Sequence, residues 1–120
     1  MNVSARETEF AVGAPEASTS SLARLLIDRD EAERLAAVLK AIADPTRLQL
    51  LRVIARAPAG EACVADLTDC LGLRQPTVSH HLKVMTEAGL LTRERRGTWV
   101  WYAVDGGGLN RVRDILPRAV

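Results

Sequence analysis

The stretch "GLRQPTVSHHLKVMTEAGLLTRERRGTWVWYAV", residues 72–104, changes its hydrophobic period halfway along. Over residues 75–88 the apolar side chains recur at the spacing of an α-helix, which ends before Gly89. From there apolar and polar residues alternate on either side of "RRG", a pattern that predicts a β-hairpin with Gly97 in its turn. The sequence therefore predicts one helix followed directly by two antiparallel strands.

The helix predicted over residues 75–88 has two chemically different faces. Projection at about 100° per residue places a mainly apolar group on the inner side, namely Val78, His81, Leu82 and Met85. The opposite side and the N-terminal entrance carry hydrogen-bonding or basic side chains, namely Arg74, Gln75, Thr77, Ser79, His80 and Lys83. Side chains of these types read base edges in the major groove of DNA. An ordinary solvated helix would carry more Glu and Lys, so the pattern favours a DNA-recognition helix.

Three arginines lie near the tip of the predicted hairpin, namely Arg93, Arg95 and Arg96. Such side chains can reach phosphates or the adjacent minor groove, whose negative potential attracts arginine. The local charge agrees, because residues 74–98 carry 5 basic and 2 acidic side chains, whereas residues 1–73 carry 8 basic and 11 acidic ones. Basic hairpin tips also occur without a ligand, so the arginines support DNA binding without proving it. We expect Trp99 and Trp101 to pack in the core or at the hinge of the hairpin rather than to stack on bases.

Three further helices are predicted ahead of this one, over residues 30–44, 45–56 and 63–72. The residue before Pro45 leaves the helical region, so Asp44 closes the first helix and caps the second, with Pro45 at its first position. Their apolar stripes predict the core, namely Leu35, Val38, Leu39, Ile42, Leu48, Leu51, Ile54, Val64, Leu67 and Leu71. A short last helix is expected over residues 109–116, after the three glycines that precede it.

The chain of 120 residues is long enough for one domain and too short for two. Residues 1–21 lack periodicity and predict a flexible arm, and residues 22–120 then form the domain, with the apolar run at 22–27 docked against its body. The order α-α-α-α-β-β-α predicts a winged helix-turn-helix that is mostly α with a small β-hairpin, although the order alone also fits other small α+β domains. No apolar run is long enough to cross a membrane and no signal pattern is present, so the expected compartment is the cytoplasm.

Two segments carry a resemblance to a known family, "LKAIADPTRLQLL" at residues 39–51 and the stretch at 72–104. With the cysteine-bearing segment between them, they resemble the ArsR/SmtB family of bacterial metal- and stress-responsive repressors over about residues 35–105. The resemblance implies a homodimer joined mainly through its first and last helices, which binds an operator in double-stranded DNA with the form of an imperfect inverted repeat. By position, the resemblance implies that four side chains face the groove, namely Gln75, Thr77, Ser79 and His80. Arg74 stands where many relatives have Ser, so base preference is expected to differ.

The two cysteines raise the question of a metal or redox site. Several heavy-metal-sensing relatives carry "ELCVCDLC" where this chain reads "EACVADLT" at residues 61–68. Cys63 matches the first of those thiolates, whereas Ala65 and Thr68 replace the other two. Cys70 lies about 10 Å further along a helix, too far for a disulfide or a shared metal. Either the chain bends at Cys63, or a ligand comes from the other subunit, or no such site exists.

Cys63 is the better sensor candidate of the two, because a helix N-terminus stabilises a thiolate. Cys70 is expected to be partly buried and unreactive. The family's other metal site, across the C-terminal helices, is not expected, since Gly107 and Arg118 stand at two of its ligand positions.

The leading hypothesis is a sequence-specific repressor that an inducer releases from its operator. Arsenite or another soft, thiophilic metal ion at Cys63, helped by Cys70 or by a partner subunit, is the expected inducer, and no other cofactor is expected. Two alternatives stay open: a dimeric DNA-binding or interaction module whose response comes from a separate sensor protein, and a thiol-based redox sensor. The sequence shows no nucleophile with a base, no complete metal site and no phosphate loop, so an enzyme is not expected.

Overall fold

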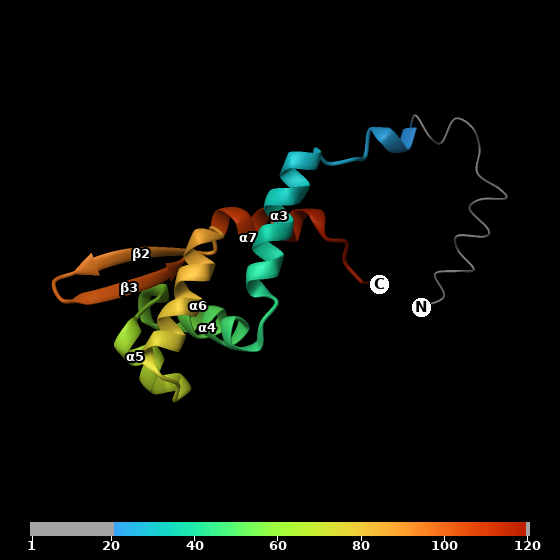
Figure 1. Cartoon of the computed structure of the whole chain (residues 1–120). Helices are drawn as coiled ribbons and strands as arrows, with labels where there is room; N and C mark the ends of the chain where they lie inside the picture. The colour runs from blue at the N-terminus through green and yellow to red at the C-terminus, as the bar shows by residue number, and fades with distance from the viewer. Residues whose placement is uncertain (1–20, 120) are drawn as a thin grey trace.

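The structure is a computed structural model, and it describes residues 21–119. A body of helices carries a β-hairpin that projects from one side, while α7 lies across α3 on the other side (Figure 1). The elements run in the order α3 (Arg29–Ile42), α4 (Pro45–Arg56), the 3-10 turn η1 (Pro58–Gly60), β1 (Glu61–Cys63), α5 (Val64–Leu71), α6 (Gln75–Glu87), β2 (Leu91–Arg96), β3 (Trp99–Val104) and α7 (Gly106–Ile115). The predicted winged helix-turn-helix is confirmed, with one more strand than expected. Within the described part of the chain, no helix is long and apolar enough to cross a membrane.

Helix α4 begins as predicted. Pro45 occupies its first turn, where no amide donor is needed, and the Asp44 carboxylate accepts a hydrogen bond from the backbone amide of Arg47 at 3.0 Å. The turn between α3 and α4 is therefore set by local sequence alone.

Helix α7 begins earlier than predicted, at Gly106 rather than after the glycines. Asp105 caps it by accepting a hydrogen bond from the backbone amide of Gly107 at 3.1 Å, which offsets the poor helix propensity of glycine. A Cβ at Gly108 would lie 3.1 Å from Cγ2 of Val38, so the missing side chain lets α7 approach α3 closely. Gly108 is thus part of the contact between α3 and α7.

The sheet has three antiparallel strands in the order β1-β3-β2, where the sequence predicted only the hairpin of β2 and β3. Ala62 pairs with Tyr102 and Cys63 with Trp101, so Cys63, which was expected to open a helix, ends an edge strand instead. Cys63 is its last residue and also the N-cap position of α5. Three residues are too few to show an alternating pattern, and their place in the sheet depends on a partner strand far along the chain.

The core lies between the helices and the sheet, and its fully buried side chains are Leu50, Ile54, Leu67, Val78, Leu82, Met85 and Leu90. The prediction that Leu39 and Leu48 belong to the core was wrong, because Leu39 is 39% exposed and Leu48 is 55% exposed. Helix α4 turns Leu50 and Ile54 inward, and at helical spacing Leu48 must then point away from the core.

The apolar segment at residues 22–27 does not dock against the body as predicted. Leu25 is 76% exposed and Leu26 is 79% exposed. The segment makes a short turn, in which the Leu25 amide donates to the Leu22 carbonyl at 2.9 Å, and it leads away from the free end of α3 (Figure 1). The rest of the predicted arm, residues 1–20, lies outside the described residues.

Leu82 anchors α6 in the core, so Leu82→Ala should lower the free energy of unfolding by about 2–5 kcal/mol through lost burial and a cavity. Its neighbour Lys83 is exposed, and Lys83→Ala serves as the control, with an expected change below about 0.5 kcal/mol. Urea denaturation followed by circular dichroism measures both changes. Equal effects of the two substitutions would show that this face does not hold the helix.

Candidate nucleic-acid interface

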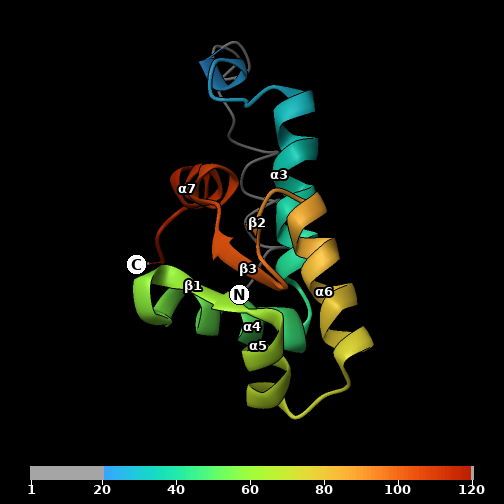
Figure 2. The same ribbon diagram turned by 90° about the vertical axis from the view of Figure 1, so that its left-hand side faces the viewer.

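Helix α6 presents the predicted polar face to solvent. Val78, Leu82 and Met85 have no exposed surface, and they fix the rotation of the helix about its axis. On the other side, five of the six predicted side chains are exposed and Ser79 is half-buried; the exposed five are Arg74, Gln75, Thr77, His80 and Lys83. Figure 2 shows α6 along one edge of the molecule, with α5 and the connecting turn below it. The polar face is therefore free to enter a groove of DNA.

His81, on the inner flank of α6, joins this helix to the junction of α3 and α4. Its side chain is only 15% exposed, in agreement with the predicted inward placement. Its Nδ1 lies 3.2 Å from Nη1 of Arg47, and Nε of the same arginine donates to the carbonyl of Ala41 at 2.6 Å. The backbone amide of Arg47 also lowers the pKa of Asp44, whose carboxylate lies 4.0 Å from His81. These contacts hold α6 against the end of α3.

The hairpin of β2 and β3 is here called the wing. Its three arginines differ in whether they have partners. Arg93 and Arg95 are exposed and have no hydrogen-bonded or ionic partner within residues 21–119. Arg96, on the opposite face of β2, donates to both carboxylate oxygens of Glu61 at 2.7 Å and also pairs with Glu94. The uncompensated positive charge of the wing thus belongs to Arg93 and Arg95.

Arg96 ties the wing to strand β1. Its guanidinium carbon lies 5.1 Å from the centre of the Trp101 ring, so the side chain crosses an aromatic face on its way to Glu61. Hydrogen bonds with Glu61 and Glu94 raise the pKa of Arg96, and those from Arg96 lower the pKa of Glu61. The role of Glu61 has no signal in the sequence, because 35 residues separate it from Arg96.

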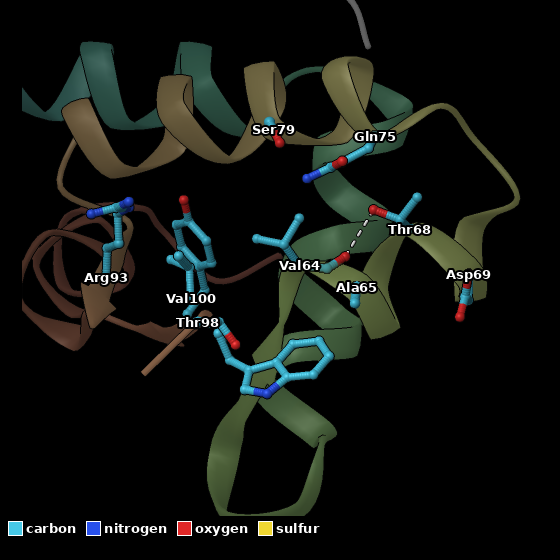
Figure 3. A pocket seen from close by; sticks show the side chains of 11 residues that line it. Val64, Ala65, Thr68, Asp69, Gln75, Ser79, Arg93, Thr98 and Val100 are labelled. Atoms are coloured by element: carbon cyan, nitrogen blue, oxygen red, sulfur yellow. Dashed lines mark hydrogen bonds between the residues drawn. The ribbon is translucent and has the colours of Figure 1, made fainter. Parts of the chain in front are cut away.

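A hollow of about 460 Å³ lies between α5, α6 and the wing (Figure 3). Its lining consists of Val64, Ala65, Thr68, Asp69, Gln75, Ser79, Arg93, Thr98, Trp99, Val100 and Tyr102. Gln75 and Ser79 point into it from α6, so two of the predicted DNA-contacting residues of the helix share one space with Arg93 of the wing. Trp99 is 55% exposed there, and the expectation that it packs in the core or hinge was wrong. A strand residue so close to the Gly97 turn lies beyond the reach of the core.

The two cysteines lie at opposite ends of α5, and both are free thiols. Cys63 is only 5% exposed, whereas Cys70 is exposed, contrary to the prediction that it is partly buried. Among residues 21–119, no group of three or more His, Cys, Asp or Glu side chains is placed to hold a metal ion.

Comparison with known proteins places the chain among DNA-binding regulators. The family model described as "Bacterial regulatory protein, arsR family" matches residues 44–93, from the N-cap of α4 to the third residue of β2. An uncharacterized HTH-type transcriptional regulator of Methanocaldococcus jannaschii is 40% identical over 85 residues, which cover 70% of this chain and 89% of that protein. The arsenic resistance transcriptional regulator ArsR1 of Pseudomonas putida is 48% identical over 65 residues, which cover 54% of this chain but only 49% of that protein.

A solved structure resembles this one over a similar span. It is the homodimeric winged helix-turn-helix DNA-binding domain of a possible ArsR-family regulator from Mycobacterium bovis. The two chains superpose with a TM-score of 0.61 at 29% identity, over 75% of this chain and 82% of that one.

The pairing of Glu61 with Arg96 should make stability depend on pH in a defined direction. Because the pKa of Glu61 is lowered from its ordinary value of 4.5, the pair stabilises the fold above that pH and the contribution is lost as the pH falls through the lowered value. The difference in Tm between the native protein and Glu61→Gln should therefore be largest near neutrality and shrink in acid. Glu33→Gln, which removes an exposed pair with Arg29, is the control and should change Tm little at any pH. A difference for Glu61→Gln that stays constant down to acid pH would contradict the role of the pair.

Proposed function

This chain belongs to the arsR family of bacterial regulatory proteins, and from that we propose that it is a homodimeric transcriptional repressor that binds an imperfect inverted repeat in DNA through α6 and the wing. Family membership also confirms the expectation of a DNA-binding regulator rather than an enzyme. The observation that carries the proposal is the pairing of a fully buried stripe on α6 with an exposed face of hydrogen-bonding side chains. Such a helix can enter the major groove without any change in the fold.

The side chains divide by role in this proposal. Gln75, Thr77, Ser79 and His80 read base edges, and Arg74 and Lys83 contact phosphates at the rims of the groove. On the wing, Arg93 and Arg95 supply the charge that releases counterions from the phosphate backbone. Arg96 acts indirectly, because two carboxylates already occupy its guanidinium and it sets where the wing stands.

The dimer forms through α3 and α7, and three observations support this arrangement. These two helices pack against each other at the end of the molecule away from the wing (Figure 1). Exposed apolar side chains remain near them, such as Leu39 at 39% and Leu116 at 52%, and a second subunit would cover them. The related domain from Mycobacterium bovis is homodimeric.

We further propose that the inducer is arsenite, bound at Cys63 with the partner subunit completing its coordination, since Cys70 lies at the other end of α5; the name of the related Pseudomonas putida protein supports this ligand class. The Cys63 thiol replaces one hydroxyl group of arsenous acid, and a water molecule leaves. Because Cys63 is 5% exposed and pairs with Trp101, the bound arsenic cannot fit unless β1 separates from β3. That movement also disturbs Glu61 and hence Arg96, so the wing shifts relative to α6.

The energy required for release is small. If inducer binding favours the displaced wing by a few kcal/mol, the operator affinity falls by about 100-fold or more. A dimer that answers instead to a separate sensor protein would show no response to arsenite, and a redox sensor would answer to peroxide through the exposed Cys70.

Phosphate and base contacts can be told apart by their salt dependence. Arg95→Ala should weaken binding to operator and to unrelated duplex alike and reduce the slope of log affinity against log salt by about 1. Gln75→Ala should leave that slope unchanged but cost about 1–3 kcal/mol at particular operator positions. Fluorescence anisotropy over a range of salt concentrations measures both. An unchanged slope for Arg95→Ala would remove the wing from the interface.

Cys63→Ser should abolish release from the operator by arsenite while leaving operator affinity intact, because the buried thiol is replaced by a hydroxyl of similar size. Cys70→Ser is the matched control, and it should retain release with at most weakened sensitivity. The measurement is an operator-binding titration of reduced protein with arsenite. Normal release in the Cys63 variant would refute the thiol mechanism and leave DNA binding itself unaffected.

A further inference from the structure

Trp99 is 55% exposed, although tryptophan side chains are on average highly buried in folded proteins, and within residues 21–119 its indole makes no aromatic or cation–π contact. It lines the hollow between α5, α6 and the wing, next to Thr98 at the hairpin turn. Its neighbour on the same strand face, Trp101, is half-buried and covered by Arg96. The strand therefore holds one tryptophan with a structural contact and one that is open to a ligand.

The position of the hollow matches the path of a DNA strand. When α6 fills the major groove and the tip of the wing reaches the neighbouring minor groove, the sugar-phosphate strand that separates the two grooves must cross between them. The space between α6 and the wing in this protein is the hollow that Trp99 lines.

The side chains of the hollow suit a sugar-phosphate backbone. Arg93 stands at one end and Asp69 at the other, so a phosphate is favoured at the Arg93 end and repelled at the Asp69 end (Figure 3). Gln75 and Ser79 add uncharged hydrogen-bonding groups from α6. The indole offers an apolar face, and deoxyribose is the apolar part of the backbone.

We propose that this hollow binds one strand of the DNA backbone, with a phosphate at Arg93 and a deoxyribose further along the same strand against the indole of Trp99. The inference rests on the proposed function. It adds an apolar contact between Trp99 and the sugar, whose strength depends on neither base sequence nor charge. Trp99 then contributes affinity for any duplex, in contrast to the base-reading face of α6 and to the charge of Arg93.

Two substitutions at one position separate this role from a structural one. Trp99→Ala should weaken binding to operator and to unrelated duplex by the same factor, about tenfold, with no change in the salt slope. Trp99→Phe keeps an aromatic face and should remain within about twofold of the native affinity. Because Trp99 is exposed, both variants should unfold at nearly the native temperature. At the far end of the hollow, Asp69→Asn should strengthen binding to all duplexes.

Fluorescence reports the contact directly. The chain has two tryptophans, so Trp101→Phe leaves Trp99 as the sole tryptophan, whose emission is selected by exciting on the long-wavelength side of the tyrosine absorption. Its emission should change on titration with unrelated duplex and lose its accessibility to iodide, whereas Trp101 in the Trp99→Phe variant should change little.

These experiments distinguish a failure of the proposed function from a failure of the proposed backbone contact at Trp99. If the native protein binds no duplex, the proposed function fails. If it binds DNA but Trp99→Ala binds equally well, or iodide still reaches Trp99 in the complex, the backbone contact is wrong while the function stands. A loss of affinity confined to operator DNA would also overturn the proposal, since it would make Trp99 a base-reading residue.

Discussion

The rotation of α6 about its own axis is the constraint on which the rest of the molecule depends. Val78, Leu82 and Met85 are completely buried in the core, and no other rotation of the helix would bury all three. The opposite side must therefore face solvent, whatever residues it carries. Hydrophobic burial of one stripe thus presents a row of hydrogen-bonding side chains without any specific interaction to orient them. The contact between His81 and Arg47 adds a polar link from the same helix to the α3–α4 junction.

The wing is positioned by different means. It projects from the helical body, and in addition to the pairing of β3 with β1, an ion pair joins Arg96 to Glu61 while a cation–π contact places Arg96 over Trp101. Arg96 carries both contacts, and its partner Glu61 lies on the same short strand as Cys63. A thiol ligand that opens this strand would release the wing as well. The location of Cys63, rather than its chemistry alone, is what couples it to DNA affinity in the proposed mechanism.

Some sequence-based expectations failed for identifiable reasons. The stripe on α4 was assigned through Leu48, but two apolar faces compete on that helix, and only packing against its neighbours selects Leu50 and Ile54. Strand β1 was not predicted, because three residues carry no periodic signal, and its last residue, Cys63, was expected to begin a helix. Trp99 was expected to pack inward, and its exposure follows from its place near the tip of the wing.

By itself the sequence determined the order of the helices and the hairpin, the capped start of α4 and the two faces of α6. All of these depend on residues within a few positions of one another, through helical spacing, alternation and capping. Only the tertiary structure decided that Arg96 pairs with Glu61, that Cys63 is buried in an edge strand, and that Trp99 shares a hollow with α6. Each of these joins residues at least twenty positions apart, and no local pattern in a chain records which distant partner it will meet.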